Sequence, residues 1–323
     1  MTVLFIVCTA VLAAAAAAFV FSPLPAAGLM RRLFKNPKLS DPDSLKDAQD
    51  GTLVFCDLEY PSEYADNTLD LYFPRSSGGL LPVILWVHGG AFVGGDKSDV
   101  RYFARMLAYE GYAVISMNYR RAPEARFPVP VLQIKDVCSW ISGEGSSLNL
   151  DETRIVLAGD SAGAHSCALF ALIQSDEKYA RRIGIEQSVP REHIKGLMLY
   201  CGPYDCAEMK KIKGIFGFMI RRAGQVYFGT KNWAEDFDGT ATVRYHACSG
   251  LPPVFITDGN THSFENQARM LESALKNAGA DVRSFFIPAG EESAAHEYQF
   301  LTDSQAGAGC FERTLQFLRD YVF

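Results

Sequence analysis

The residues Gly159–Gly163 form the pattern Gly-Asp-Ser-Ala-Gly, in which a glycine lies two positions before and two positions after the serine. An apolar run, Arg154–Ala158, precedes the pattern, and an apolar helical stretch begins at Ala162. A serine on such a sharp strand-to-helix turn is lifted away from the backbone, and the helix N-terminus favours negative charge beside it. The pattern therefore predicts Ser161 as a nucleophile for acyl transfer. Its neighbour Asp160 is expected to brace the turn through backbone hydrogen bonds.

A second glycine-rich segment, His88–Phe92, also follows an apolar run. Glycine allows backbone N–H groups to turn toward a substrate oxygen, so Gly89 and Gly90 are candidate donors of an oxyanion hole. The N–H of Ala162 would be the third donor. His88 is expected to anchor the loop rather than act as a base, because the motif depends on the position of its backbone.

These groups need a scaffold, and the chain after residue 50 supplies one by alternating short apolar runs with amphipathic stretches. Continuous Val, Ile and Leu runs are typical of strands buried on both faces of a parallel sheet. The predicted class is α/β, with a mostly parallel central sheet of about eight strands, helices on both faces and an antiparallel edge. The predicted strands are Thr52–Leu58, Thr68–Phe73, Val83–His88, Ala113–Asn118, Arg154–Ala158, Lys195–Cys201, Val254–Thr257 and Val282–Ile287.

The two glycine motifs resemble those of the hormone-sensitive-lipase-like family of esterases and lipases. The stretches Tyr119–Glu124 and Phe127-Pro128, which come after the strand that follows His88–Phe92, add to the resemblance. The resemblance covers about residues 50 to 323. It implies the α/β-hydrolase fold, hydrolysis of carboxylic esters, a capped pocket, and neither a metal nor another cofactor.

A nucleophilic serine needs a base, and the chain has six histidines. α/β-Hydrolases carry nucleophile, acid and histidine in that order along the chain, which excludes His88. His165 lies one turn along the helix after Ser161 and is expected to make a packing or polar contact. His296 lies between the last predicted strand and the final helix, where the family carries its histidine. His296 is therefore the predicted base.

The acid that would complete a triad has three candidates. In the family it lies in a Gly-x-x-Asp stretch, and counting from Gly259 puts His262 at that position. Asp258, at the end of the preceding strand, is the preferred candidate because a shifted loop could aim it at the base. Asp205 and Glu265 are the alternatives. A serine–histidine dyad without an acid is also open.

The segment at about 206–250 separates two predicted core strands and is longer than a normal connection. It is rich in aromatic and apolar residues, so we expect it to form a helical cap over the site. The predicted organisation has a hydrophobic segment at 1–30, a connector or part of the cap at 31–50, and the hydrolase domain at 51–323.

Residues 1–30 contain no Asp, Glu, Lys or Arg, and the apolar run Val3–Phe21 has about the length that spans a bilayer. A single N-terminal membrane anchor fits this length, and the basic residues after it, beginning at Arg31, would then favour a cytoplasmic catalytic domain. Small residues at Ala26 and Gly28 keep a cleaved secretory signal, and hence secretion, as the alternative. A buried alanine-rich helix is the third interpretation.

The net charge and the cysteine spacing argue against two kinds of binding partner, nucleic acids and zinc ions. The 323 residues carry a formal charge of −6, which argues against nucleic-acid binding. Among the eight cysteines no Cys-x-x-Cys pair or Cys/His ligand spacing occurs, so a zinc site is not supported. The expected partner is a small-molecule ester, and the oligomeric state is left open.

The leading functional prediction is a serine hydrolase that cleaves esters of short to medium acyl chains through an acyl-enzyme at Ser161. The first alternative is an amide or peptide hydrolase with the same groups. The second is a membrane-tethered binding module that has lost catalysis, and His262 at the expected acid position motivates it.

Overall fold

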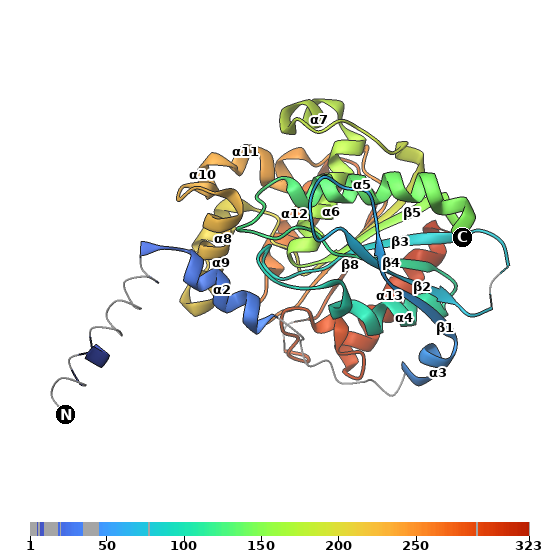
Figure 1. Cartoon of the computed structure of the whole chain (residues 1–323), viewed down its shortest axis with the longest axis horizontal. Helices are drawn as coiled ribbons and strands as arrows, with labels where there is room; N and C mark the ends of the chain where they lie inside the picture. The colour runs from blue at the N-terminus through green and yellow to red at the C-terminus, as the bar shows by residue number, and fades with distance from the viewer. Residues whose placement is uncertain are drawn as a thin grey trace.

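A sheet of eight strands runs through the molecule in the order β1-β2-β4-β3-β5-β6-β7-β8 (Figure 1). This computed structural model describes residues 5, 7–9, 19, 21–34, 45–76, 78–288 and 290–322. The pairs β1–β2 and β2–β4 are antiparallel and the remaining pairs are parallel. The strands are β1 (Thr52–Glu59), β2 (Thr68–Pro74), β3 (Leu81–Val87), β4 (Ala113–Met117), β5 (Leu150–Asp160), β6 (Ile194–Tyr200), β7 (Val254–Asp258) and β8 (Val282–Phe286).

The eight predicted strands and their antiparallel edge are confirmed. The central strands β3, β4 and β7 are buried along their whole length, as continuous apolar runs predict. The strand β5 begins four residues before the predicted start, because Leu150 and Asp151 also pair with β3 ahead of a register shift. The parallel strands therefore bring their carboxyl ends, and the loops that follow them, to one edge of the sheet.

Helices cover both faces of the sheet (Figure 1). One face carries α5 (Val129–Glu144), α6 (Ala162–Ser175) and α12 (Glu265–Asn277), and the other carries α4 (Arg101–Tyr109) and α13 (Gln305–Tyr321). At the periphery lie α3 (Leu45–Asp50), which packs on α4, and α7 (Glu177–Ile183). Short 3₁₀ turns occur at Lys97–Val100, Gly145–Leu148, Arg191–His193, Val243–His246 and Tyr298–Phe300.

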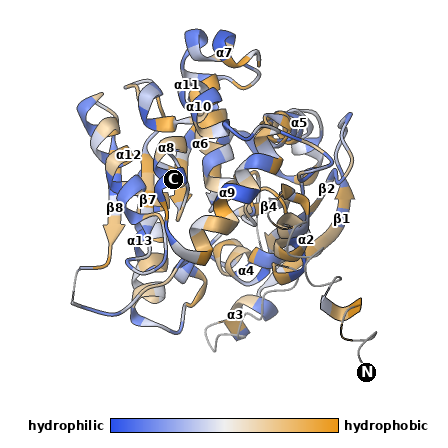
Figure 2. Cartoon of the chain, turned by 90° about the vertical axis from the view of Figure 1, so that its left-hand side faces the viewer, coloured by the Kyte–Doolittle hydropathy of each residue, from blue (hydrophilic) through white to orange (hydrophobic). Residues whose placement is uncertain are grey.

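The insertion after β6 folds into four helices, α8 (Cys206–Lys211), α9 (Gly214–Phe228), α10 (Trp233–Asp236) and α11 (Asp238–Ala241). The earlier helix α2 (Leu24–Leu33) packs against α9 (Figures 1 and 2). Side chains of these five helices form one apolar cluster with the loop after β3. Two segments far apart in the sequence therefore build one layer beside the carboxyl ends of the strands.

One arginine fastens α2 to the rest of the molecule. Arg31 donates to the carbonyl oxygens of Val93 at 2.8 Å and Ala122 at 2.6 Å. Its guanidinium also forms a two-pronged ion pair with Glu124, at 2.7 and 2.9 Å. Because charge-assisted, bidentate contacts fix geometry well, the end of α2 is held against the glycine-rich loop after β3.

The apolar run predicted to anchor or export the chain, residues 3–21, lies for the most part outside the described residues. Within the described ranges, no helix has both the length and the apolar character needed to cross a bilayer.

Candidate active site

Ser161 occupies a strained turn between β5 and α6. Its backbone has φ +49° and ψ −117°, a conformation that residues other than glycine rarely adopt. The Ser161 N–H donates to the carbonyl of Tyr200 at 2.8 Å, which holds the turn against β6. A Cβ atom at Gly163 would lie 1.9 Å from the carbonyl oxygen of Val87, so only glycine allows α6 to approach β3 this closely. The structure therefore has the strand–turn–helix geometry that the sequence predicts.

The predicted base lies against the predicted nucleophile. His296 is carried by the loop between β8 and α13, and its Nε2 atom lies 3.0 Å from Ser161 Oγ. The ring of Phe264 packs edge-on against the imidazole, with the ring centres 5.3 Å apart. Burial lowers the pKa of His296, so the imidazole is neutral at pH 7 and can accept a proton. The pair can act as a nucleophile with its general base.

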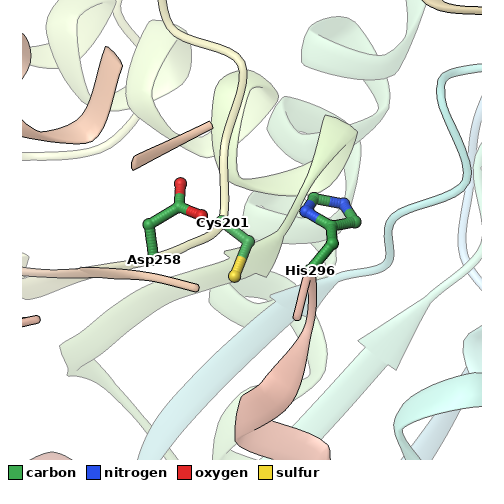
Figure 3. A group of neighbouring side chains, drawn as sticks. All are labelled: Cys201, Asp258 and His296. Carbon is green, nitrogen blue, oxygen red and sulfur yellow. The ribbon is translucent and has the colours of Figure 1, made fainter. Parts of the chain in front are cut away.

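A serine lies between the base and the preferred acid. The hydroxyl of Ser263 is 2.8 Å from His296 Nδ1 and also donates to Asp258 Oδ1. Asp258 ends β7 and is completely buried, with Cys201 beside it (Figure 3). Asp258 is thus connected to His296 through Ser263, whereas the sequence predicted that it would be aimed at the imidazole directly.

The expectation that His262 occupies the acid position is wrong. His262 is exposed and has φ +50°, so the chain turns there and presents the next residue, Ser263, to the imidazole. The two alternative acids are engaged elsewhere. Asp205 forms an ion pair with Arg244 and caps α8, and Glu265 pairs with Arg269 at 2.7 Å on α12.

Cys201, Asp258 and His296 each offer one potential ligand atom, and these atoms lie within 4.8 Å of one another (Figure 3). The chemistry of this donor set does not fit a resident metal ion. Burial raises the pKa of the Cys201 thiol well above its usual value, so the sulfur stays protonated, whereas metals bind thiolates. Both ring nitrogens of His296 are within hydrogen-bond distance of serine hydroxyls. The absence of a metal remains a prediction.

The predicted oxyanion donors are not equivalent. The Gly89 N–H donates to Asp160 Oδ2 at 2.8 Å, and Asp160 Oδ1 accepts from Trp86 Nε1 at 2.7 Å. Asp160 therefore braces the loop after β3 rather than the turn around the serine. Gly90 has φ +111°, and Ala162 is the first residue of α6, where a helix has no internal acceptor for the N–H. Because the Gly89 N–H is already engaged, the amides of Gly90 and Ala162 are the predicted donors that are left for a substrate oxygen.

Three carboxyl groups, two of them unpredicted, line the site beside the serine. Glu297 directly follows the base in the left-handed conformation, and its Oε1 atom lies 3.7 Å from His296 Nε2. Burial and the neighbouring Asp160 carboxylate raise the pKa of Glu297. Burial raises the pKa of Asp160 to about 6 and that of Asp99 to about 7. The position of Glu297 next to His296 was the one sequence signal that could have pointed to it.

The other two histidines weighed as bases have structural contacts. Nδ1 of His88 donates to the carbonyl of Gly89 at 2.7 Å, and its ring stacks on Tyr119. Nε2 of His165 donates to the carbonyl of Ala241 at 2.7 Å, which joins α6 to the cap. Burial lowers the pKa of each ring to about 4, so both are neutral. These are the anchoring and packing roles that the sequence predicted.

Two cavities meet at Ser161. The smaller, about 20 Å³, lies under the cap, and residues from α8, α9 and α10 close it, among them Met209, Gly224 and Trp233. The larger, about 310 Å³, contains His296 in its wall and is rimmed by Leu33 and Phe34 at the end of α2. The reacting oxygen therefore lies between a small apolar cavity and a larger one that the base faces.

Comparison with known proteins places this geometry in a family. The family model named BD-FAE matches residues 69–275, which is more than half of the chain. The acetyl esterase of Salmonella enteritidis PT4 (strain P125109) is 34% identical over 225 residues, which are 67% of this chain and 65% of the relative. The chain thus spans less than two thirds of the length of that curated relative.

Solved structures share the fold. Esterase B from Lactobacillus rhamnosis HN001 superimposes with a TM-score of 0.74 at 21% identity, over 97% of this chain and 94% of that one. The carboxylesterase EstE1, cloned from a metagenomic library, gives a TM-score of 0.70 at 21% identity, over 92% and 98%. These likenesses confirm the predicted α/β-hydrolase fold. The chain belongs to the BD-FAE family, and the resemblance of its motifs to the hormone-sensitive-lipase-like α/β-hydrolases is confirmed.

Proposed function

We propose that the chain is a carboxylesterase that cleaves esters of short to medium acyl chains through an acyl-enzyme at Ser161. The 3.0 Å contact between Ser161 Oγ and Nε2 of a neutral His296 carries the proposal. A strained nucleophile beside a neutral imidazole, within an apolar pocket, is the arrangement that acyl transfer requires. The similarity to an acetyl esterase supports an ester as the substrate.

The geometry assigns a task to each group. His296 Nε2 accepts the proton of Ser161 as Oγ attacks the ester carbonyl, and the amides of Gly90 and Ala162 stabilise the oxygen that becomes negative. The imidazolium then gives this proton to the leaving alcohol as the C–O bond breaks. Water, deprotonated by the same nitrogen, attacks the acyl-enzyme and releases the carboxylic acid.

The two cavities distinguish the two halves of the ester. The leaving alcohol must lie beside His296, because that residue protonates it, and only the cavity of about 310 Å³ has His296 in its wall. The acyl group then enters the cavity of about 20 Å³, which has little more room than a water molecule needs. This cavity favours the short end of the proposed acyl range, acetyl above all.

The function is tested with a fluorophosphonate probe and a substrate panel. We expect the wild type to be labelled on the peptide that contains Ser161, and Ser161→Ala to remain unlabelled. We also expect p-nitrophenyl acetate and butyrate to be cleaved rapidly and the matching anilides to be cleaved slowly. An unlabelled wild type would favour the binding module, and anilide cleavage at the ester rate would favour the amide hydrolase.

Shortening Met209 is expected to shift acyl preference. Met209→Ala enlarges the small cavity, so kcat/KM for hexanoyl relative to acetyl esters should rise about tenfold or more, because each methylene contributes roughly 1–3 kcal/mol in an apolar pocket. Met219→Ala is the matched control, since Met219 lines only the larger of these two cavities. If both variants changed the acyl ratio equally, the assignment of the cavities would be wrong.

For localisation, we propose a single N-terminal membrane anchor at residues 3–21, with secretion after signal cleavage as the alternative. The absence of charge in residues 1–30 supports the anchor. A cut after Gly28 would divide α2, whose later residue Arg31 fastens that helix to the catalytic domain. The anchored chain should remain in membranes during alkaline carbonate washing, and deletion of residues 1–21 should release it.

A further inference from the structure

We infer that Ser263 is a positioning residue that couples the base to its acid, so that His296 and Asp258 act on each other through a hydroxyl group. This inference rests on the proposed function, because it assigns His296 its tautomer for accepting the proton of Ser161. In place of a direct contact between acid and imidazole, four groups form a hydrogen-bonded chain: Ser161, His296, Ser263 and Asp258.

The first step concerns the single proton of the Ser263 hydroxyl. Oγ lies 2.8 Å from His296 Nδ1 and within hydrogen-bond distance of Asp258 Oδ1. An ionised carboxylate can only accept hydrogen bonds, so the hydroxyl proton points to Asp258. The Ser263 oxygen then faces the imidazole with a lone pair, which requires a proton on Nδ1.

The second step follows for the other ring nitrogen. A neutral imidazole carries one proton, and the Nδ1–H tautomer leaves Nε2 as the acceptor. Nε2 is the atom 3.0 Å from Ser161 Oγ, so the tautomer fixed by Ser263 is the one that can deprotonate the nucleophile. All hydrogen bonds in the chain therefore run in one direction, from Ser161 toward Asp258.

The third step concerns the surroundings of Asp258, which hydrogen-bonds to Ser263, the residue in contact with the base. Its carboxyl is wholly buried, and its Oδ1 atom also accepts the Phe264 N–H at 3.3 Å. Among the described residues, Oδ2 has no hydrogen-bond partner. Burial raises the pKa of Asp258 to about 7, so the carboxylate form predominates above that pH. Ser263 is thus the link through which this charge can stabilise the imidazolium formed during turnover.

The inference is tested first on the unmodified protein. With ¹⁵N-labelled histidine at pH 8.5, the His296 resonances, assigned by their loss in His296→Gln, should report a proton on Nδ1 and none on Nε2. A proton on Nε2 would overturn the inference. This measurement does not depend on turnover, so it is separate from the proposed function, which fails if the wild type is neither labelled by the phosphonate nor active.

The kinetic test uses Ser263→Ala, Asp258→Asn and the double variant at pH 8.5. Ser263 lines neither of the cavities that meet at Ser161, so Ser263→Ala should lower kcat about 10²- to 10⁴-fold and leave KM within about twofold. The kcat of the double variant should be no lower than that of the less active single variant. Ser293→Ala is the matched control, because it removes a nearby hydroxyl that contacts Thr261 instead, and its kcat should stay near the wild-type value. Near-wild-type kcat in Ser263→Ala, or losses that multiply in the double variant, would refute the coupling.

Discussion

Ser161→Ala and His296→Ala are each expected to lower kcat for p-nitrophenyl acetate by about 10⁴- to 10⁶-fold, and the double variant by no more. The two side chains form one hydrogen-bonded unit with 3.0 Å between Oγ and Nε2, so either loss removes the activated nucleophile. The residual rate would come from substrate binding and from the backbone amides. Initial rates of the three variants and the wild type measure this directly.

The control for that series is Ser166→Ala. Ser166 is buried one turn further along α6, where its hydroxyl donates to the Ala162 carbonyl at 3.1 Å. Its loss should leave kcat close to the wild-type value. If the losses of Ser161→Ala and His296→Ala multiplied in the double variant, the two residues would act independently and the proposed mechanism would be wrong.

Gly163→Ala is expected to lower the free energy of unfolding by about 3 kcal/mol, or to prevent folding. The added Cβ would lie 1.9 Å from Val87 O and 2.8 Å from His88 O, two backbone atoms at the carboxyl end of the buried strand β3. Neither can move without displacing β3 or α6, and with them the turn that holds Ser161. Urea denaturation followed by circular dichroism measures the loss.

Gly143→Ala serves as the control for this substitution. Gly143 lies in α5 and has no heavy atom within 4 Å of its added Cβ. Alanine there should raise stability by up to about 1 kcal/mol, because glycine is a poor helix former. Equal urea midpoints for Gly163→Ala and the wild type would show that α6 does not need its close approach to β3.

The scaffold could be predicted because its signals are local. A strand buried on both faces, such as Leu81–Val87, must consist almost entirely of apolar residues, and its pattern survives without knowledge of its neighbours. The strand-to-helix turn that carries Ser161 could be predicted for a similar reason, because the small residues that it needs to avoid steric clashes all lie within five positions of the sequence. The cap insertion was visible from its length and apolar composition.

The acid side of the site could not be predicted because it depends on how a loop turns. Counting from Gly259 assumes a fixed path, whereas the positive φ of His262 reverses the direction of the chain and exposes that side chain. The result brings Ser263, which is chemically unremarkable in the sequence, between Asp258 and His296. A hydroxyl that mediates such a contact has no spacing signature. The contact of α2 with the cap was also missed, because residues up to 30 were assigned to the anchor or signal segment and only residues 31–50 were considered as part of the cap.

The hydrogen bond from Gly89 to Asp160 has a consequence for the charge that the site can tolerate. A carboxylate at this point lies close to where the substrate oxygen becomes negative, and two carboxylates, Asp160 and Glu297, would oppose that charge together. Burial and the neighbouring Asp160 raise the pKa of Glu297, so Glu297 binds a proton more tightly than an isolated glutamate does. A proton held by this pair removes one negative charge from the place where the substrate oxygen becomes negative, so the shift opposes a build-up of charge beside the reacting ester.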